Sequence, residues 1–326
     1  MKKTFQQLEF DTNNQVSEPE NEQVDVQATE DWNITKEKET AVEKFQEAPP
    51  KEEQKQLTPI QRFQQNIEQY EQTVLPNLLK KHNIDPAQFK QIVLSEIKKN
   101  PKLLEAFMSN PASMFASILA GAEIGLIPSD MLGEFYLIPR RIDNKAAVTP
   151  LIGYKGLVNI LLRSGEITRI HTEVVYDGEH FEPIYGLEPN IIHKPNFNLP
   201  RTSDKVKFVY AVAKMKNGEY QFAVLSKLDI INIQSLSRYN NDLYFNDKKD
   251  PNKWMIRKIV LVQLSKMLPK DYYSKKAVEM DGQLEGGAML VLDEDNQVKV
   301  VDGKKISTLK QASVVNTLNS LPEIPQ

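Results

Sequence analysis

The spacing of apolar residues changes near Glu134, and this change constrains the fold more than any other feature. Before it, apolar residues recur every three to four positions, and Thr58-Pro59 and Asp85-Pro86 are typical helix starts. After it, short runs of alternating apolar and polar residues predominate, as in strands. Helices followed mostly by short strands indicate an α+β fold. We therefore expect a helical N-terminal part and an antiparallel sheet and β-hairpin packed with helices.

Three helices are expected in the N-terminal part. Their ranges are 60–81, divided near Pro76, then 86–100, ending before Pro101, and 111–124. The third helix is apolar nearly all round, which indicates that it is buried. Gly125 follows it and is expected to cap its C-terminal end.

The strands expected after residue 134 form a hairpin, a meander and a second hairpin. They cover residues 134–141, 146–154, 168–176, 180–185, 190–193, 205–216 and 219–226, with helices at 153–164, 227–237 and 253–268. Asn217-Gly218 predicts a two-residue type I′ turn, which would pair Met215 with Tyr220. Both faces of residues 209–213 are apolar, so helices are expected to cover both sides of this strand.

Charge divides the chain into three segments. Residues 1–56 hold 7 Lys and Arg against 14 Asp and Glu, residues 57–280 hold 30 against 23, and residues 281–326 hold 4 against 7. A basic middle between acidic ends indicates a polyanionic partner such as nucleic acid. We expect a disordered acidic leader at 1–56, a core at 57–280 and a disordered acidic tail at 281–326. The tail has strand-like stretches at 288–292 and 298–301.

Several classes of function lack their characteristic residues. Because there is no cysteine, disulfides, cysteine-ligated zinc and a cysteine nucleophile are excluded, and a reducing cytoplasm is expected. We expect neither a secretory signal nor a membrane span. No GxxxxGK[ST] or GxGxxG motif is present, and the four histidines form no metal-binding motif. We therefore expect no cofactor, no metal and no enzyme activity, while Asp242, Asp247 and Asp250 leave a metal site as an alternative.

Two of the expected helices carry cations opposite their apolar face. In residues 153–164, wound at 100° per residue, Lys155, Asn159 and Arg163 share that side, and the two cations lie roughly 12 Å apart along the axis. In residues 253–268, Lys258 and Lys266 lie away from the apolar side, together with an indole. Cations that neutralise phosphates beside rings that stack on bases bind single strands without reading sequence. A plain solvated face is the alternative.

This pattern ranks the candidate DNA-binding residues. The first group is Lys155, Arg163, Lys258 and Lys266, with Asn159 between the first two. The second group holds the cations of the first hairpin tip and of the later strands and loop, namely Arg140, Arg141, Lys207, Lys214 and Arg238, with Tyr154 and Trp254 as stacking residues.

Five stretches occur in a recognisable order between about residues 70 and 269. They are SMFASILAGAEIGLIPSDMLGEFYLIP, LIGYKGLVNILLRSGEI, VYAVAKMKNGEYQFAVLS, SLSR and WMIRK…LSKMLP. In this order and spacing the chain resembles the RecT family of phage and prophage single-strand annealing proteins. The GYKG…RSG block followed by W-M-x-x-K is highly specific. The acidic leader is not covered, and the family's Thr and Arg after the first lysine of the last stretch are replaced by Ile259 and Val262.

The resemblance implies a curved antiparallel sheet with a long helix and a hairpin. It implies a homo-oligomer, either a ring or a helical filament, that binds single-stranded DNA and anneals it through a duplex intermediate without nucleotide hydrolysis, in the cytoplasm of a bacterial host. A phage exonuclease and host single-strand-binding protein are the implied partners, the second at the C-terminal segment. By position, the motif cations are Lys155, Arg163, Lys258 and Lys266. The alternatives are a passive single-strand-binding protein and, from another class, a metal-dependent nuclease built on residues 242–250.

Overall fold

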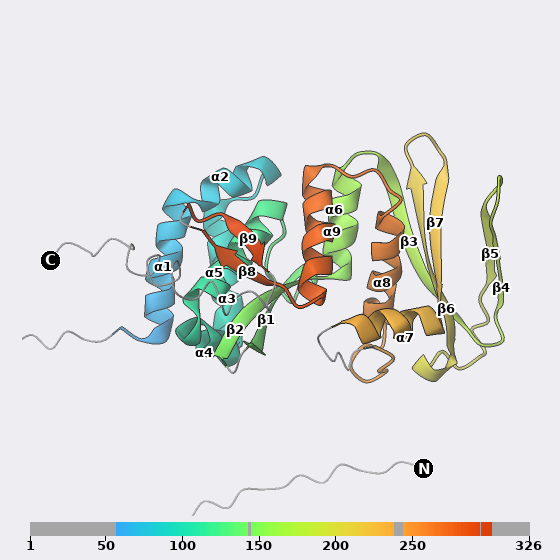
Figure 1. The fold of residues 1–326 in the computed structure, drawn as a ribbon, viewed down its shortest axis with the longest axis horizontal. Helices are drawn as coiled ribbons and strands as arrows, with labels where there is room; N and C mark the ends of the chain where they lie inside the picture. Colours follow the sequence, from blue (N-terminus) through green and yellow to red (C-terminus); the bar gives the residue numbers. More distant parts are fainter. Residues whose placement is uncertain (1–56, 143–144, 238–243, 294, 302–326) are drawn as a thin grey trace, which may run out of the picture. The chain divides into compact units, whose positions relative to one another are not determined.

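The computed structural model describes residues 57–142, 145–237, 244–293 and 295–301 (Figure 1). The acidic leader and residues 302–326 lie outside this range. Five helices form the N-terminal part, in agreement with the helical pattern of the sequence. They are α1 (Pro59–Thr73), α2 (Leu75–Leu79), α3 (Pro86–Lys99), α4 (Pro101–Ser109) and α5 (Pro111–Ile124), with a 3₁₀ turn, η1 (Lys80–His82), after α2.

Local capping chemistry sets these helix boundaries. The Thr58 side chain accepts from the backbone N–H of Gln61, whose own side chain accepts from the Thr58 N–H, which completes a capping box. The expected division near Pro76 is confirmed by the break between α1 and α2. Helix α4 differs from the expectation, in which one helix ends before Pro101 and the next begins at residue 111. In the structure Pro101 occupies the first turn of a new helix that Asn100 caps through a bond from the Lys102 N–H.

Helix α5 lies in the core, as its uniformly apolar sequence predicted. Gly125 ends it in the left-handed conformation at φ +67°, which confirms the expected cap. The first hairpin, β1 (Phe135–Ile142) and β2 (Lys145–Ile152), packs against α4 and α5. Two serines of α5 bind its backbone directly. The Ser113 hydroxyl accepts from the Val148 N–H at 3.0 Å, and the Ser117 hydroxyl donates to the Val148 carbonyl at 3.2 Å.

A three-stranded antiparallel sheet follows the short helix α6 (Tyr154–Arg163). Its strands stand in the order β3 (Ile167–Tyr176), β6 (Val206–Met215) and β7 (Tyr220–Ser226). The next two strands, β4 (His180–Ile184) and β5 (Asn190–Lys194), pair only with each other among the described residues. The expected meander is therefore wrong at its first step, because β3 pairs with β6 and not with β4.

One face of the sheet packs on helix α8 (Trp254–Ser265), and the β4–β5 hairpin lies over the other face (Figure 1). Phe181 on β4 stacks on Tyr210 of β6, with ring centroids 5.5 Å apart, and Tyr185 just beyond β4 lies 5.2 Å from Phe222 of β7. Helices were expected on both sides. Aromatic side chains of the β4–β5 hairpin cover the outer face instead. Apolar patterning alone does not distinguish this packing from helix packing.

The β6–β7 pairing differs from the expected register by one residue. Lys214, and not Met215, lies opposite Tyr220. Gly218 has φ +90°, whereas Asn217 has no positive φ, so the connection is not a type I′ turn. The Met215 N–H donates to the Glu219 carbonyl at 2.8 Å, which closes a loop one residue longer than the sequence suggested. Because side chains alternate between faces, a shift of one residue changes which β7 residues face the core.

The last described elements extend the fold beyond residue 280. Helix α7 (Lys227–Leu236) and a short 3₁₀ turn, η2 (Ser203–Lys205), flank the sheet. Helix α9 (Tyr272–Glu285) packs against α6 and α5, and a hairpin of β8 (Met289–Leu292) and β9 (Val298–Val301) packs on α5. Both strand-like stretches are confirmed, but α9 was not expected. The α+β class, with antiparallel sheets and a hairpin packed with helices, is confirmed. Among the helices of the described residues, none combines the length and the apolar composition that a membrane-spanning helix requires.

Candidate nucleic-acid interface

The polar side of α6 faces the segment that joins α5 to β1. Gly153 caps this helix, and a Cβ there would lie 2.3 Å from the Gly133 carbonyl, so the two backbones approach as closely as glycine allows. The methylene groups of Lys155 lie beside Gly133, and its ammonium end is exposed. The aliphatic part of the Lys155 side chain is therefore packed against backbone, while its ammonium group is free to contact a ligand.

The other two polar residues of α6 make contacts within the fold, and of the two only Arg163 remains exposed. Asn159 donates to the Glu134 carboxylate at 2.8 Å. Arg163 donates to the Gly125 carbonyl at 2.8 Å and to the Ile124 carbonyl at 3.2 Å. These carbonyls are the unpaired acceptors at the C-terminal end of α5. The guanidinium of Arg163 thus caps a neighbouring helix, and burial lowers its pKa.

Lys258 does not lie on an outer face, which corrects the expectation for α8. Its side chain is buried, and its ammonium group donates to Asp281 at 2.7 Å and to Glu285 at 3.4 Å. Burial opposes this charge, but the two carboxylates outweigh it and raise the pKa of Lys258 above its ordinary value. Helix α8 lies between the sheet and α6, and α9 supplies both carboxylates (Figure 1). A helical wheel of α8 alone does not show this, because the covering helix α9 was not expected from the sequence.

The aromatic candidates meet at the N-terminal ends of α6 and α8. The rings of Tyr154 and Trp254 lie 5.1 Å apart at 34°, and Trp254 remains 41% exposed. The Tyr154 hydroxyl bonds the Thr172 hydroxyl at 2.9 Å. Arg257, which the sequence did not single out, lies 6.0 Å from the indole and donates to the Thr172 carbonyl and to Glu173. The indole is thus fixed between an aromatic ring and a guanidinium.

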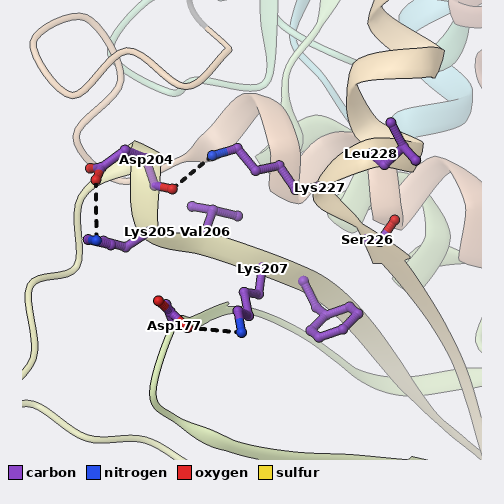
Figure 2. A pocket seen from close by; sticks show the side chains of 9 residues that line it. Asp177, Asp204, Lys205, Val206, Lys207, Ser226, Lys227 and Leu228 are labelled. Carbon is purple, nitrogen blue, oxygen red and sulfur yellow. Dashed lines mark hydrogen bonds and ion pairs between the residues drawn. The ribbon is translucent and has the colours of Figure 1, made fainter.

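The second group of cations is divided between bound and exposed residues. Lys207 pairs with Asp177 at 2.9 Å, and this contact lowers the pKa of Asp177. The pair lines a pocket of about 550 Å³ between β6 and the start of α7, where Lys205 also faces a carboxylate (Figure 2). Arg141 and Lys214 are exposed, and Arg140 is half-buried on β1. Arg238 lies outside the described residues.

The acidic residues proposed for a metal site have structural contacts. Asp250 accepts from the N–H groups of Trp254 and Met255, both at 2.9 Å, and so caps α8. Asp247 accepts from Ser203 and from Lys253. Asp242 lies outside the described residues. Within the described ranges, no three carboxylates or histidines are placed to hold a metal ion.

Two exposed candidates lie together at one end of the helices, and a third lies at the far end of α8. Lys155 and Trp254 begin α6 and α8, whose N-terminal ends are joined by the Tyr154–Trp254 contact. Lys266 is exposed at the opposite end of α8, where a cation also interacts favourably with the helix dipole. A backbone phosphate at Lys155 beside a base on Trp254 would match the chemistry of single-strand binding.

Comparison with known proteins gives two matches. The model of the RecT family matches residues 87–299. Protein RecT from Escherichia coli (strain K12) is 33% identical over 196 residues, which is 59% of this chain and 69% of that protein. The residues that the family model matches run from the first turn of α3 into β9, and they include α6 and α8.

Proposed function

The chain belongs to the RecT family, which makes it a DNA-binding recombination protein of the annealing type, and from this we propose that it binds single-stranded DNA and pairs complementary strands without nucleotide hydrolysis. The family membership carries the proposal. The exposed Lys155 beside the Tyr154–Trp254 pair supports it, because a cation and an accessible indole are the two groups that hold a strand by phosphate and base.

The interface that we propose is smaller than the two continuous stripes expected from sequence. Lys155 and Trp254 are at its centre, and Lys266 lies roughly 18 Å away at the far end of α8. Arg141 is a further exposed cation on the first hairpin. Arg163, Asn159 and Lys258 support the fold around it. Exposed cations hold the backbone, so base edges remain available to an incoming strand. Neutralised phosphates also reduce the repulsion between the two strands.

We further propose that subunits assemble so that these short surfaces join along one strand. One surface with few cations binds weakly, and linked copies gain avidity without any new contact. Because avidity needs linked copies, we propose that the described core both binds DNA and forms the contacts between subunits. We also propose that the protein acts in the bacterial cytoplasm beside a phage exonuclease. Its acidic C-terminal segment is the proposed binding site for the host single-strand-binding protein.

Annealing of two complementary oligonucleotides labelled for energy transfer tests the function. With purified protein and no nucleotide, we expect pairing faster than in buffer, with both strands intact on a denaturing gel. Binding without faster pairing would identify a passive single-strand-binding protein and refute the annealing proposal. Shortened strands that appear only with magnesium would identify a nuclease.

A matched pair of double variants tests the interface. Lys155→Ala with Lys266→Ala should weaken binding to an unstructured strand and lower the salt slope by roughly 1.4, because each phosphate contact on a single strand contributes about 0.7. Lys98→Ala with Lys102→Ala removes the same charge from exposed positions on α3 and α4 and should leave the slope unchanged. Equal slopes for the two double variants would contradict this placement.

A further inference from the structure

A second cation–aromatic surface lies on the outer face of the three-stranded sheet. Arg169 of β3 lies opposite Lys214 of β6, which lies opposite Tyr220 of β7. The three side chains therefore form one row across the sheet, with neighbouring strands about 4.8 Å apart. All three are exposed, and Tyr220 is 54% exposed. We call them the sheet row. Of these residues, only Lys214 is a candidate from the sequence.

The electrostatics of the sheet row are unfavourable without an anion. Like charges directly opposite each other on paired strands repel. Within the described ranges, no carboxylate lies within 4.0 Å of either cation, although Glu166 and Glu219 are exposed nearby. Two neighbouring phosphates of one strand above the pair would each contact one cation and remove this repulsion.

Local backbone geometry places the two cations opposite each other. The β3–β6 register shifts between Ile167 and Arg169, so Thr168 is an extra residue on β3. The Thr168 hydroxyl donates to the Lys214 carbonyl at 3.1 Å and holds this irregularity in place. Such bulges change the direction of neighbouring side chains. Without the extra residue, Arg169 would point to the face that packs on α8.

The aromatic member of the row adds a surface for a base. The Lys214 ammonium lies 5.7 Å from the centre of the Tyr220 ring, so the ring and the cations belong to one patch. The β4–β5 hairpin covers the adjoining rows, where it contacts Tyr210 and Phe222. The sheet row at the end of the sheet stays outside these contacts.

We infer that the sheet row is a further binding site for single-stranded nucleic acid, with phosphates on Arg169 and Lys214 and a base stacked on Tyr220. The inference rests on the proposed function for the presence of a strand, but it uses residues outside the α6–α8 interface. An acidic polypeptide would also meet the two cations. The exposed ring favours nucleic acid, because stacking on an aromatic ring needs a planar base.

Binding of the full chain to labelled oligo-dT tests the cations. Arg169→Ala with Lys214→Ala should lower the salt slope by roughly 1.4, as two phosphate contacts on a single strand require. The Lys98→Ala, Lys102→Ala double variant is again the charge-matched control. Melting temperatures should stay within a few degrees of the parent protein, because both side chains are exposed.

Substitutions of Tyr220 test the stacked base. Tyr220→Phe should bind as the parent does, and Tyr220→Leu should bind roughly 5- to 150-fold more weakly, the range expected for loss of one stacked base. On an abasic strand of the same length, the difference between Phe and Leu should disappear. This comparison separates stacking from a structural effect, which would persist on the abasic strand.

The outcomes separate this inference from the proposed function. A parent protein that binds no strand at low salt would refute both. If the Lys155, Lys266 variant loses affinity while the sheet-row variants bind as the parent does, only the sheet row is refuted. Loss of affinity through the cations, with no effect of Tyr220→Leu and equal competition by polyglutamate, would identify an acidic polypeptide site and overturn the nucleic-acid assignment.

Discussion

Replacement of Lys258 by methionine should destabilise the protein strongly, although the sequence pattern placed this residue on the surface. Methionine has a similar length and fills the buried space, so the main change is the loss of one positive charge. The buried Asp281 carboxylate would then have no counterion, and Glu285, whose side chain is 34% exposed, would lie beside it. Removing one partner of a buried ion pair typically costs about 3–5 kcal/mol.

This free energy corresponds to a large change in melting temperature. For a domain of 150–250 residues, each kcal/mol lowers the melting temperature by about 2–4 °C, so Lys258→Met should lower it by roughly 6–20 °C. Circular dichroism at increasing temperature measures this change. Lys155→Ala, on the exposed side of α6, is the matched control and should change it by no more than about 2 °C.

The loss should depend on pH because the Glu285 carboxylate can take up a proton. Burial raises the pKa of Glu285, Lys258 opposes this rise, and Asp281 adds to it. Because its pKa is raised in the folded protein, Glu285 adds to stability at pH values below its ordinary pKa of 4.5. This contribution is lost as the pH rises through the folded-state pKa. Without the ammonium group its lowering effect is lost, so Glu285 holds its proton to a higher pH.

The destabilisation by Lys258→Met should therefore be small near pH 4.5 and large near pH 7.5. A second variant isolates the pair. Asp281→Leu combined with Lys258→Met should be less destabilised than the sum of the single changes, because the buried charge is removed with its partner. An unchanged melting temperature at pH 7.5, or a loss that is equal at both pH values, would refute the buried-charge argument.

Three further changes test other contacts. Gly125→Ala should destabilise the protein by about 1–3 kcal/mol in chemical denaturation, because φ is +67° there and a Cβ would lie within 2.6 Å of His82 and Arg163; a neutral effect would contradict it. Asp250→Ala should cost about 1 kcal/mol by loss of the α8 cap, with Asp250→Asn retaining most of the stability. Arg163→Lys should lower the melting temperature, since an ammonium group cannot reproduce the bonds that a guanidinium makes to two adjacent carbonyls, and an unchanged value would show that this cap is dispensable.

The sequence by itself determined those features that depend on neighbouring residues. Thr58-Pro59 and Asp85-Pro86 mark helix starts because a side-chain acceptor and a proline act within one turn. Gly125 marks a helix end through its own φ angle. The α+β class follows from the change in apolar spacing, and the family follows from ordered stretches that include both α6 and α8.

Only the tertiary structure decided which cations remain available. On a helical wheel Lys155, Arg163 and Lys258 look alike, since the wheel shows direction but not what lies opposite. The structure places a glycine backbone beside Lys155, the end of α5 beside Arg163, and two carboxylates of α9 around Lys258. These partners come from segments tens of residues away in the sequence. The charge of a helix face is local, whereas its exposure depends on packing, and the proposed DNA-binding surface depends on both.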